Sequence, residues 1–330
     1  VYKRQPKNYT ADGQHLAALL QFFDNPETAA DAALVRALFL TPAWGGAPGS
    51  RPAFLITAPD RGYGKTRLSD ALGLLYGGTI EIDPAARDNP NLLPRLLSPA
   101  ALTRRIVRID NVRSSLSNGL LESLITTPTI SGHRLFQGEA TRANTLTWVV
   151  TANCPRVSRD LADRSFIIRL AKPNPNPRWW DDVVGFTEQH KDCILADAIA
   201  ALQGPPLCDP PADRWGAWVE GVLTRCTADA ADVVAINQQR RDAADEEVEE
   251  VAAILDAVAH AEGIDWTADG RAFVTCNRML ELVNHVLGVS WSAKRVAAVL
   301  RGHIEAGRLP WTITRTTASR GYEVRKGGSC

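Results

Sequence analysis

The stretch Gly62-Tyr63-Gly64-Lys65-Thr66 constrains the fold of this chain more than any other feature. It stands shortly after the apolar run 54–57 and directly before a predicted helix over 67–75. A buried strand that runs through a glycine-rich turn into a helix wraps backbone N–H groups and the helix N-terminus around a phosphate chain. Lys65 then reaches the outer phosphates and the Thr66 hydroxyl ligates Mg²⁺. We therefore predict a site for ATP and Mg²⁺, with a plain strand-to-helix turn as the alternative.

The loop departs from the phosphate-loop pattern at Pro59, where the pattern has glycine. Pro59 keeps a carbonyl and a φ that suits a turn, while Gly62 and Gly64 keep the freedom for close backbone approach. We expect the nucleotide to contact Pro59, Asp60, Arg61, Gly62, Tyr63, Gly64, Lys65, Thr66 and Arg67.

Composition indicates an ordinary globular protein with no bias toward a polyanionic partner. The 330 residues suit two domains, and 37 basic residues balance 37 acidic ones. The six cysteines form no Cys-x-x-Cys pair, and the interpretation is free thiols in a reducing cytosol without structural zinc. With no signal peptide and no membrane-spanning run, we expect a cytoplasmic protein of a bacterial or phage-infected cell. The start at Val1 suggests a piece of a longer protein.

Strands and helices alternate through the first two thirds of the chain. Two helices within 14–40 precede the phosphate loop, and helices are also expected over 119–126 and 179–202. Strands are expected at 54–57, 79–83, 105–110, 146–152 and 165–170, with a hairpin from 129 to 142. This order predicts an α/β fold with a mostly parallel sheet and helices on both of its faces.

The C-terminal region predicts a separate, smaller domain. A long helix from about Asp242, helices over 277–287 and 292–306, and strands over 310–316 and 321–325 form a winged-helix pattern. From Ser290 onward the sequence has eight basic residues and only two acidic ones. This local positive charge indicates phosphate contacts, with a basic protein-binding module as the alternative. The predicted division is an N-terminal helical segment 1–33, an ATPase domain 34–204, a helical connector 205–247 and a winged helix 248–330.

Three polar residues near strand ends are the candidates for catalysis. Asp110 ends a predicted strand, where a carboxylate in a phosphate-loop protein holds Mg²⁺. Its neighbour Asn111 can orient a water but cannot accept its proton, which predicts slow turnover or a base from elsewhere. Asn153 follows the strand 146–152, where its amide can bridge the attacking water and the γ-phosphate.

Arg164 stands directly before the strand 165–170. A guanidinium there can stabilise transition-state charge on a nucleotide held by a neighbouring subunit. A surface ion pair with Asp160 or Asp163 is the alternative.

These motifs occur in one order that resembles a known family. The segments 54–66, 109–112, 133–142, 151–153 and 160–164 are together similar to the AAA+ ATPase domain of phage and mobile-element replication helicases, which are related to superfamily 3 helicases and often fused to a primase. The resemblance implies that Lys65 and Thr66 are the phosphate-loop residues, Asp110 the Mg²⁺ carboxylate, Asn153 the sensor and Arg164 the arginine finger. Pro59 and Asp163 depart from the family's pattern.

The resemblance also implies a ring of subunits, expected to be hexameric, around single-stranded DNA. His133, Arg134 and Arg142 of the hairpin would contact the threaded strand. Lys294, Arg295 and Arg320 of the winged helix are the candidates for contacts to duplex DNA. A primase domain or protein is a further expected partner.

Three functions remain open from the sequence. The first is a ring-forming DNA helicase or translocase driven by ATP. The second is an ATP-dependent initiator or helicase loader that does not unwind, and the third is a nucleotide-binding switch or scaffold with negligible turnover.

Overall fold

The computed structural model describes residues 11–82, 92–112, 119–134, 138–152, 157–173, 176–244, 246–305, 309, 311–315 and 320–325. These residues form two compact units, 1–244 and 245–330, which are described one at a time. Within the described residues, no helix is both long enough and apolar enough to span a bilayer.

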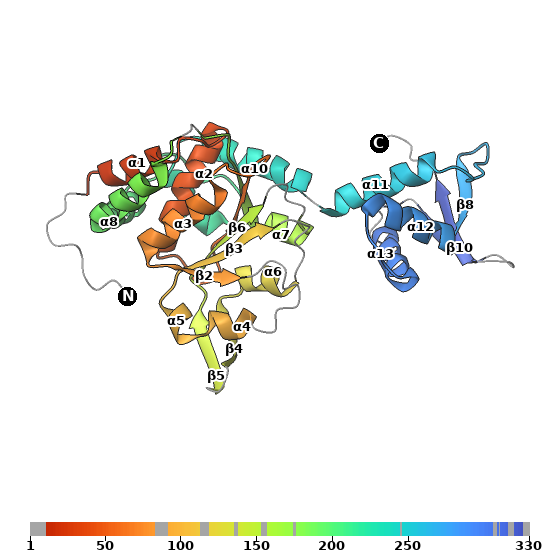
Figure 1. The fold of residues 1–330 in the computed structure, drawn as a ribbon, viewed down its shortest axis with the longest axis horizontal. Helices are drawn as coiled ribbons and strands as arrows, with labels where there is room; N and C mark the ends of the chain where they lie inside the picture. The colour runs from red at the N-terminus through yellow and green to blue at the C-terminus, as the bar shows by residue number, and fades with distance from the viewer. Residues whose placement is uncertain are drawn as a thin grey trace. The chain divides into compact units, whose positions relative to one another are not determined.

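The first unit is built on a parallel sheet of five strands (Figure 1). Its strands lie in the order β2 (Thr79–Ile82), β3 (Ile106–Val112), β6 (Thr147–Ala152), β1 (Ala53–Thr57) and β7 (Ser165–Arg169). Every residue of β1 and β6 is buried, so both faces of the sheet are covered. The predicted α/β fold with a mostly parallel sheet is confirmed.

Helices cover this sheet and bring the N-terminal segment into the same hydrophobic core as residues up to Val233. They are α1 (Gln14–Gln21), α2 (Ala29–Leu40), α3 (Lys65–Tyr76), α4 (Leu92–Leu96), α5 (Pro99–Leu102), α6 (Gly119–Thr126), α7 (Arg159–Asp163), α8 (Trp179–Gln203), α9 (Gly216–Gly221) and α10 (Ala230–Ala244), with 3-10 turns at Thr41–Ala43 and Leu223–Arg225. The short helices α4 and α7 are additions to the elements expected from the sequence, whereas α9 and α10 fall within the predicted helical connector 205–247.

Side chains of α2 and α10 cover the outer edge of β7, the last strand of the sheet. Asn237 Oδ1 accepts from the N–H of Ile167 at 2.7 Å, and Arg241 Nε donates to the carbonyl of Ser165 at 2.9 Å. The buried Asp31 accepts from the N–H of Arg169 at 2.7 Å. An uncovered strand edge would leave these groups unpaired, so the polar face of α10 closes the sheet.

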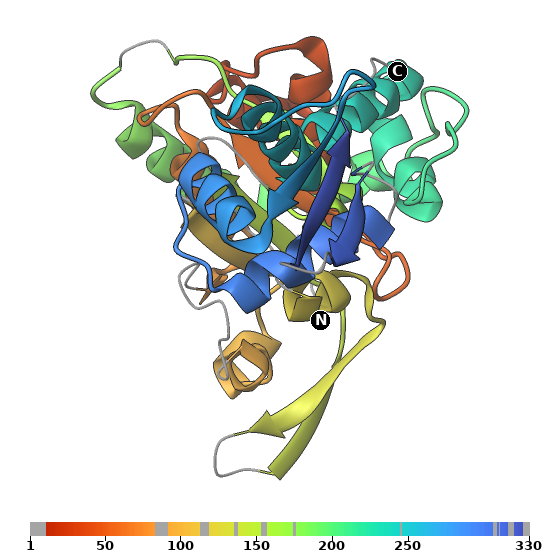
Figure 2. The ribbon, with the colours of Figure 1, turned by 90° about the vertical axis from the view of Figure 1, so that its right-hand side faces the viewer.

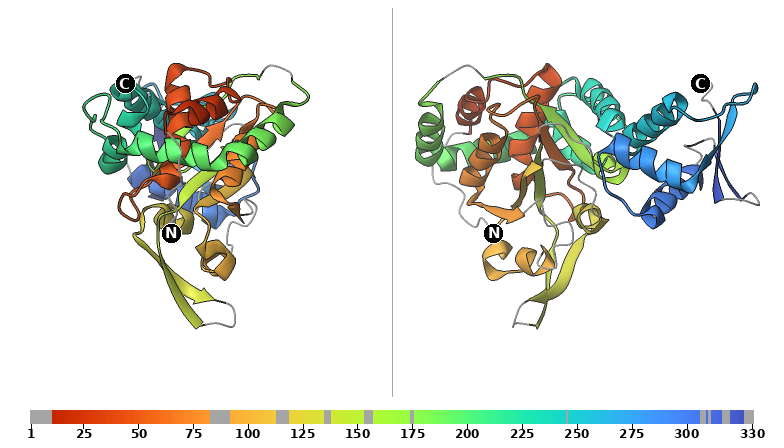
Figure 3. Two further views of the ribbon diagram at one scale, coloured as in Figure 1. Left: turned by 90° about the vertical axis from the view of Figure 1, so that its left-hand side faces the viewer. Right: turned by 45° about the vertical axis from the view of Figure 1, so that its right-hand side comes forward.

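A two-stranded hairpin, β4 (Thr129–Arg134) and β5 (Gly138–Ala143), projects from the sheet-bearing body (Figures 2 and 3). Helix α4 packs against β4, and a Cβ placed on Gly132 would lie 3.4 Å from Leu93 Cβ. The predicted hairpin is therefore present, and its turn at residues 135–137 lies outside the described residues.

The second unit has its own core, centred on Ile254, Met279, Leu300 and Val324. It comprises α11 (Glu246–His260), β8 (Arg271–Thr275), α12 (Cys276–Leu287), α13 (Ala293–Glu305), β9 (Thr312–Arg315) and β10 (Arg320–Arg325), with an antiparallel sheet in the order β8-β10-β9. β8 was not predicted from the sequence; it is a short strand that pairs with β10. The helix expected from about Asp242 starts at Glu246, since α10 extends to Ala244.

Candidate nucleotide site

The phosphate loop links β1 to α3 through two glycines in the left-handed region. Gly62 has φ +81° and Gly64 has φ +85°, conformations that side-chain-bearing residues rarely adopt. Gly64 directly precedes Lys65, the first residue of α3. A Cβ built on either glycine would meet no described atom within 4 Å, so the loop borders open space.

The groups that line this loop fit a phosphate chain. Within the part of the chain that the structure describes, no hydrogen bond takes up the N–H groups of Gly62, Tyr63 or Gly64. The N-terminus of α3 adds further N–H groups that have no partner inside the helix. Lys65 is 9% exposed, and its Nζ donates to the carbonyl of Asp60 at 2.8 Å, which folds the ammonium back over the loop.

Asn25 anchors the loop to the rest of the unit. Its Nδ2 donates to the carbonyl of Tyr63 at 3.0 Å and to that of Ala171 at 2.8 Å. One buried amide thus ties the loop to the segment after β7. Asn25 was not singled out from the sequence, because its partners are distant in the chain.

Thr66 and Asp110 meet at the carboxyl edge of the sheet. Thr66 Oγ1 donates to Asp110 Oδ1 at 3.0 Å, and Thr151 Oγ1 donates to the same oxygen at 2.5 Å. Hydroxyl and carboxylate oxygens are the ligands that Mg²⁺ prefers. The two residues predicted as metal ligands therefore lie side by side, and Thr151 is a third oxygen that the sequence analysis did not single out.

Asn111 lies within β3 rather than after it, since the strand continues to Val112. It has φ +58°, and the pairing of β3 with β6 shifts register between Ile109 and Val112. The N–H of Asn111 donates to Thr151 Oγ1 at 2.8 Å. This bulge explains how two adjacent polar residues both fit at the strand end: Asp110 joins the threonine hydroxyls and Asn111 is exposed.

Asn153, the predicted sensor, lies outside the described residues. The strand that ends directly before it, β6, lies beside β1: its last residue, Ala152, pairs with Thr57, the last residue of β1.

Arg164 lies at the opposite edge of the sheet from the phosphate loop. Ser165 opens β7 and pairs with Ala53, which opens β1, so Arg164 stands at the amino ends of the strands. Its Nη2 is 3.3 Å from Asp160 Oδ2, its side chain is 15% exposed, and its buried Nε has no hydrogen-bond partner among the described residues. The structure thus brings Lys65, Thr66 and Asp110 together and leaves Arg164 apart from them.

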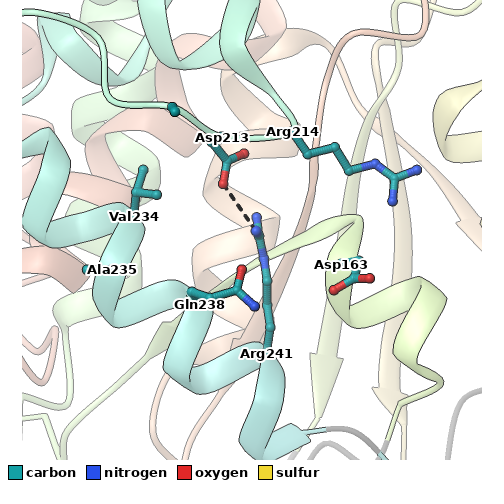
Figure 4. A pocket seen from close by; sticks show the side chains of 8 residues that line it. Asp163, Asp213, Arg214, Val234, Ala235, Gln238 and Arg241 are labelled. Atoms are coloured by element: carbon teal, nitrogen blue, oxygen red, sulfur yellow. Dashed lines mark hydrogen bonds and ion pairs between the residues drawn. The ribbon is translucent and has the colours of Figure 1, made fainter.

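A pocket of about 340 Å³ is lined in part by Asp163, the residue before Arg164 (Figure 4). Asp163 of α7, Arg214 and several side chains of α10, Gln238 among them, line it. On its wall, Arg241 Nη1 pairs with Asp213 Oδ2 at 3.2 Å. The pocket is distinct from the phosphate loop and belongs to the side of the unit that carries Arg164.

The hairpin residues predicted to contact DNA divide into two kinds. His133 is 80% exposed, with its Nε2 3.8 Å from Glu139 Oε1. The Arg142 guanidinium instead donates to the carbonyls of Leu96, Ala101 and Arg104 at 2.9–3.1 Å. These hydrogen bonds fasten the hairpin base to α4 and α5, and burial lowers the pKa of Arg142. The side chain of Arg134 lies outside the described residues.

The candidate DNA contacts of the second unit sit at the start of α13. Lys294 and Arg295 are both exposed, and the Arg295 guanidinium stacks 4.7 Å from the ring centre of Trp291. The side chain of Arg320 lies outside the described residues.

Comparison with known proteins finds solved structures of similar fold at low sequence identity. No protein-family model matches the chain, and no curated protein matches it. Among solved structures, the chain is similar to two structures of the NrS-1 C-terminal region in its apo A form, each at 14% identity. The similarity covers 98% of this chain and 77% and 76% of those chains, with TM-scores of 0.48 and 0.46. A JCV helicase structure is similar over 68% of this chain and 70% of its own, at 15% identity and a TM-score of 0.30.

Proposed function

We propose that this chain is a Mg²⁺-dependent ATPase. One contact carries the proposal. The N-terminus of α3 bears Lys65 and Thr66, and the Thr66 hydroxyl donates a 3.0 Å hydrogen bond to the Asp110 carboxylate. A lysine, a hydroxyl and a carboxylate at the mouth of a glycine loop form the minimal set for holding a triphosphate and its metal.

Each residue has a distinct task in this site. The N–H groups of Gly62 to Gly64 and the α3 N-terminus hold phosphate oxygens, and Lys65 leaves the Asp60 carbonyl to reach the outer phosphates. Thr66 and Asp110 would hold Mg²⁺, directly or through water, and Thr151 orients the carboxylate by its hydrogen bond. When bound there, Mg²⁺ would supply positive charge that stabilises the transferring phosphoryl group.

The position of Arg164 supports an assembly of several copies. Arg164 precedes β7 at the amino ends of the strands, away from the phosphate loop of its own chain, so a nucleotide that it contacts would be held by another copy. We propose a closed ring, hexameric in the simplest form, in which Arg164 of one subunit completes the site of the next.

The projecting hairpin supports coupling of hydrolysis to movement along single-stranded DNA. A rigid hairpin base, fastened by Arg142, carries the exposed His133 away from the body. In a ring such hairpins would line a channel, while Lys294 and Arg295 of the second unit would bind duplex phosphates as the recognition end of a winged helix. We therefore favour a helicase or translocase of a replication system in a phage or mobile element.

The direct test is the Lys65→Ala variant of the full chain. Its steady-state ATPase rate should fall to background, while Arg278→Ala, which removes an exposed cation of the second unit, should keep the parent rate. Unchanged turnover in Lys65→Ala would overturn the assignment.

Asn111 favours one other function, a nucleotide switch with little turnover. The residue beside the metal carboxylate has an amide where hydrolysis calls for a proton acceptor. A single-turnover assay separates the two functions: the motor releases phosphate within the assay and accelerates with single-stranded DNA, whereas the switch binds ATP and releases none.

A further inference from the structure

A second cluster of chemically reactive side chains lies between α1 and α8. It consists of His15 from α1 and of His190 and Cys193 from α8, with one ligand atom from each within 4.8 Å of the others. All three side chains are half-buried, at the rim where the two helices pack together. None of them belongs to the nucleotide site.

The spacing of two of these residues is that of a metal-binding helix. His190 and Cys193 are three residues apart, so their side chains share one face of α8. Helical geometry is interrupted at His190, which has φ −114° and ψ 16°. The sequence predicted no structural zinc, so this pair was overlooked. Only the packing of α1 on α8 adds the third side chain.

The ring of His15 is held in a setting that suits a metal ligand. Its centre lies 5.1 Å from that of His190, whose ring also lies 4.7 Å from that of Phe186. The Nδ1 atom of His15 is enclosed and has no hydrogen-bond partner among the described residues. Its distance to Asp197 Oδ2 is 3.9 Å.

Asp197 supplies the second layer of this site. It is 2% exposed, and its two oxygens accept from the N–H groups of Gly13, His15 and Leu16 at 2.9–3.1 Å, which caps the start of α1. A histidine that binds metal through one ring nitrogen commonly directs the other toward a carboxylate, which fixes the ring. Asp197 is placed for that role beside His15.

We propose that His15, His190 and Cys193 form a site for Zn²⁺ that clamps α1 to α8. Two imidazoles and one thiolate are the ligand types that favour zinc over Mg²⁺. The fourth position falls to a water, which a tetrahedral zinc accepts beside three protein ligands. Binding displaces the Cys193 thiol proton to solvent, so affinity rises with pH.

The competing explanation is an aromatic cluster of His15, His190 and Phe186 that packs without metal. Cobalt distinguishes the two, because a thiolate bound to Co²⁺ gives a charge-transfer band in the near ultraviolet. The untagged full chain titrated with Co²⁺ should develop this band, and Zn²⁺ should abolish it. Cys193→Ser should lack the band, while Cys208→Ser, which removes a half-buried thiol that donates to the Thr227 carbonyl, should keep it.

A second measurement needs no variant and so does not depend on how the variants fold. Equimolar Zn²⁺ should slow alkylation of Cys193 in the intact protein, followed by mass spectrometry of its peptides, and leave Cys208 in the same sample unaffected. A third measurement does use variants: Zn²⁺ should raise the unfolding temperature of the parent and of Cys208→Ser, but not that of His190→Gln. A protein that shows no cobalt band and no protection of Cys193 has only the aromatic cluster, and the zinc site is then wrong.

Discussion

The hydroxyl of Thr66 donates a 3.0 Å hydrogen bond to Oδ1 of Asp110, which joins the first turn of α3 to β3 across the carboxyl edge of the sheet. The two residues come from separate strand-to-helix segments, and Thr151 of β6 reaches the same carboxylate oxygen from the neighbouring strand. This convergence assembles the proposed metal site.

Asp110→Asn should reduce ATP hydrolysis without unfolding the protein. The amide keeps the size of the side chain and an oxygen that accepts from Thr66, but it removes the charge that holds Mg²⁺. Because a bound metal contributes several kcal/mol to transition-state stabilisation, we expect turnover to fall by about 100-fold or more. The measurement is the ATPase rate as a function of Mg²⁺ concentration, with the exposed Asp256→Asn as the matched control. A parent-like Mg²⁺ dependence in Asp110→Asn would contradict the metal assignment.

Arg164→Ala should be inactive alone and active in mixtures. An arginine finger is worth about 1,000-fold or more in rate, and its loss should leave ATP binding intact. Mixing Arg164→Ala with Lys65→Ala should restore part of the activity, since some interfaces then join an intact loop to an intact arginine. The readout is ATPase rate against mixing ratio, together with native mass. Strictly additive rates would show that Arg164 acts within its own chain or not at all.

Arg240→Met should destabilise the first unit strongly. Arg240 forms a two-point ion pair with the buried Asp31, with N–O distances of 2.6 and 2.9 Å, and also donates to the carbonyl of Ile167. Removing one partner leaves an uncompensated buried charge, which costs about 3–5 kcal/mol. Hydrogen exchange of β7 peptides in urea reports the loss. The exposed Arg278–Glu281 pair offers the comparison, because Arg278→Met should cost less than about 1 kcal/mol.

Substituting Lys294 and Arg295 together by alanine should weaken DNA binding uniformly across sequences. Both side chains are exposed at the start of α13, where they can neutralise phosphates. The slope of log affinity against log salt is negative, and each lost phosphate contact makes it less steep by about 0.9. Fluorescence anisotropy at several salt concentrations measures this slope, with Arg278→Ala as the control. An unchanged slope would assign the basic surface to a protein partner instead.

The local elements followed from residue patterns. The apolar run 54–57, the glycines 62 and 64 and the lysine after them predicted β1, the loop and α3, because burial and left-handed φ are set by side-chain type. Thr66 and Asp110 were also predicted as metal ligands from the sequence, and in the structure their side chains are hydrogen-bonded to each other. It missed β8, whose few residues carry no strong pattern by themselves and become a strand through pairing with β10.

Roles that depend on distant partners could not be predicted in the same way. Arg142 was expected to contact DNA, but its guanidinium serves three carbonyls of the segment from Leu96 to Arg104. A buried arginine binds whichever acceptors the fold brings near, and those acceptors are backbone atoms that leave no mark in the sequence.

The sequence by itself determined that this chain has a parallel α/β sheet with a phosphate-type loop, since strand periodicity and loop glycines are local properties. Only the tertiary structure decided what converges on what: Thr151 with Asp110, Asn25 with the loop, and His15 with His190 and Cys193. It also separated Arg164 from Lys65, because parallel strands put their opposite ends at opposite edges of the sheet. Convergence depends on how the chain packs, and packing joins residues whose separation along the sequence carries no signal.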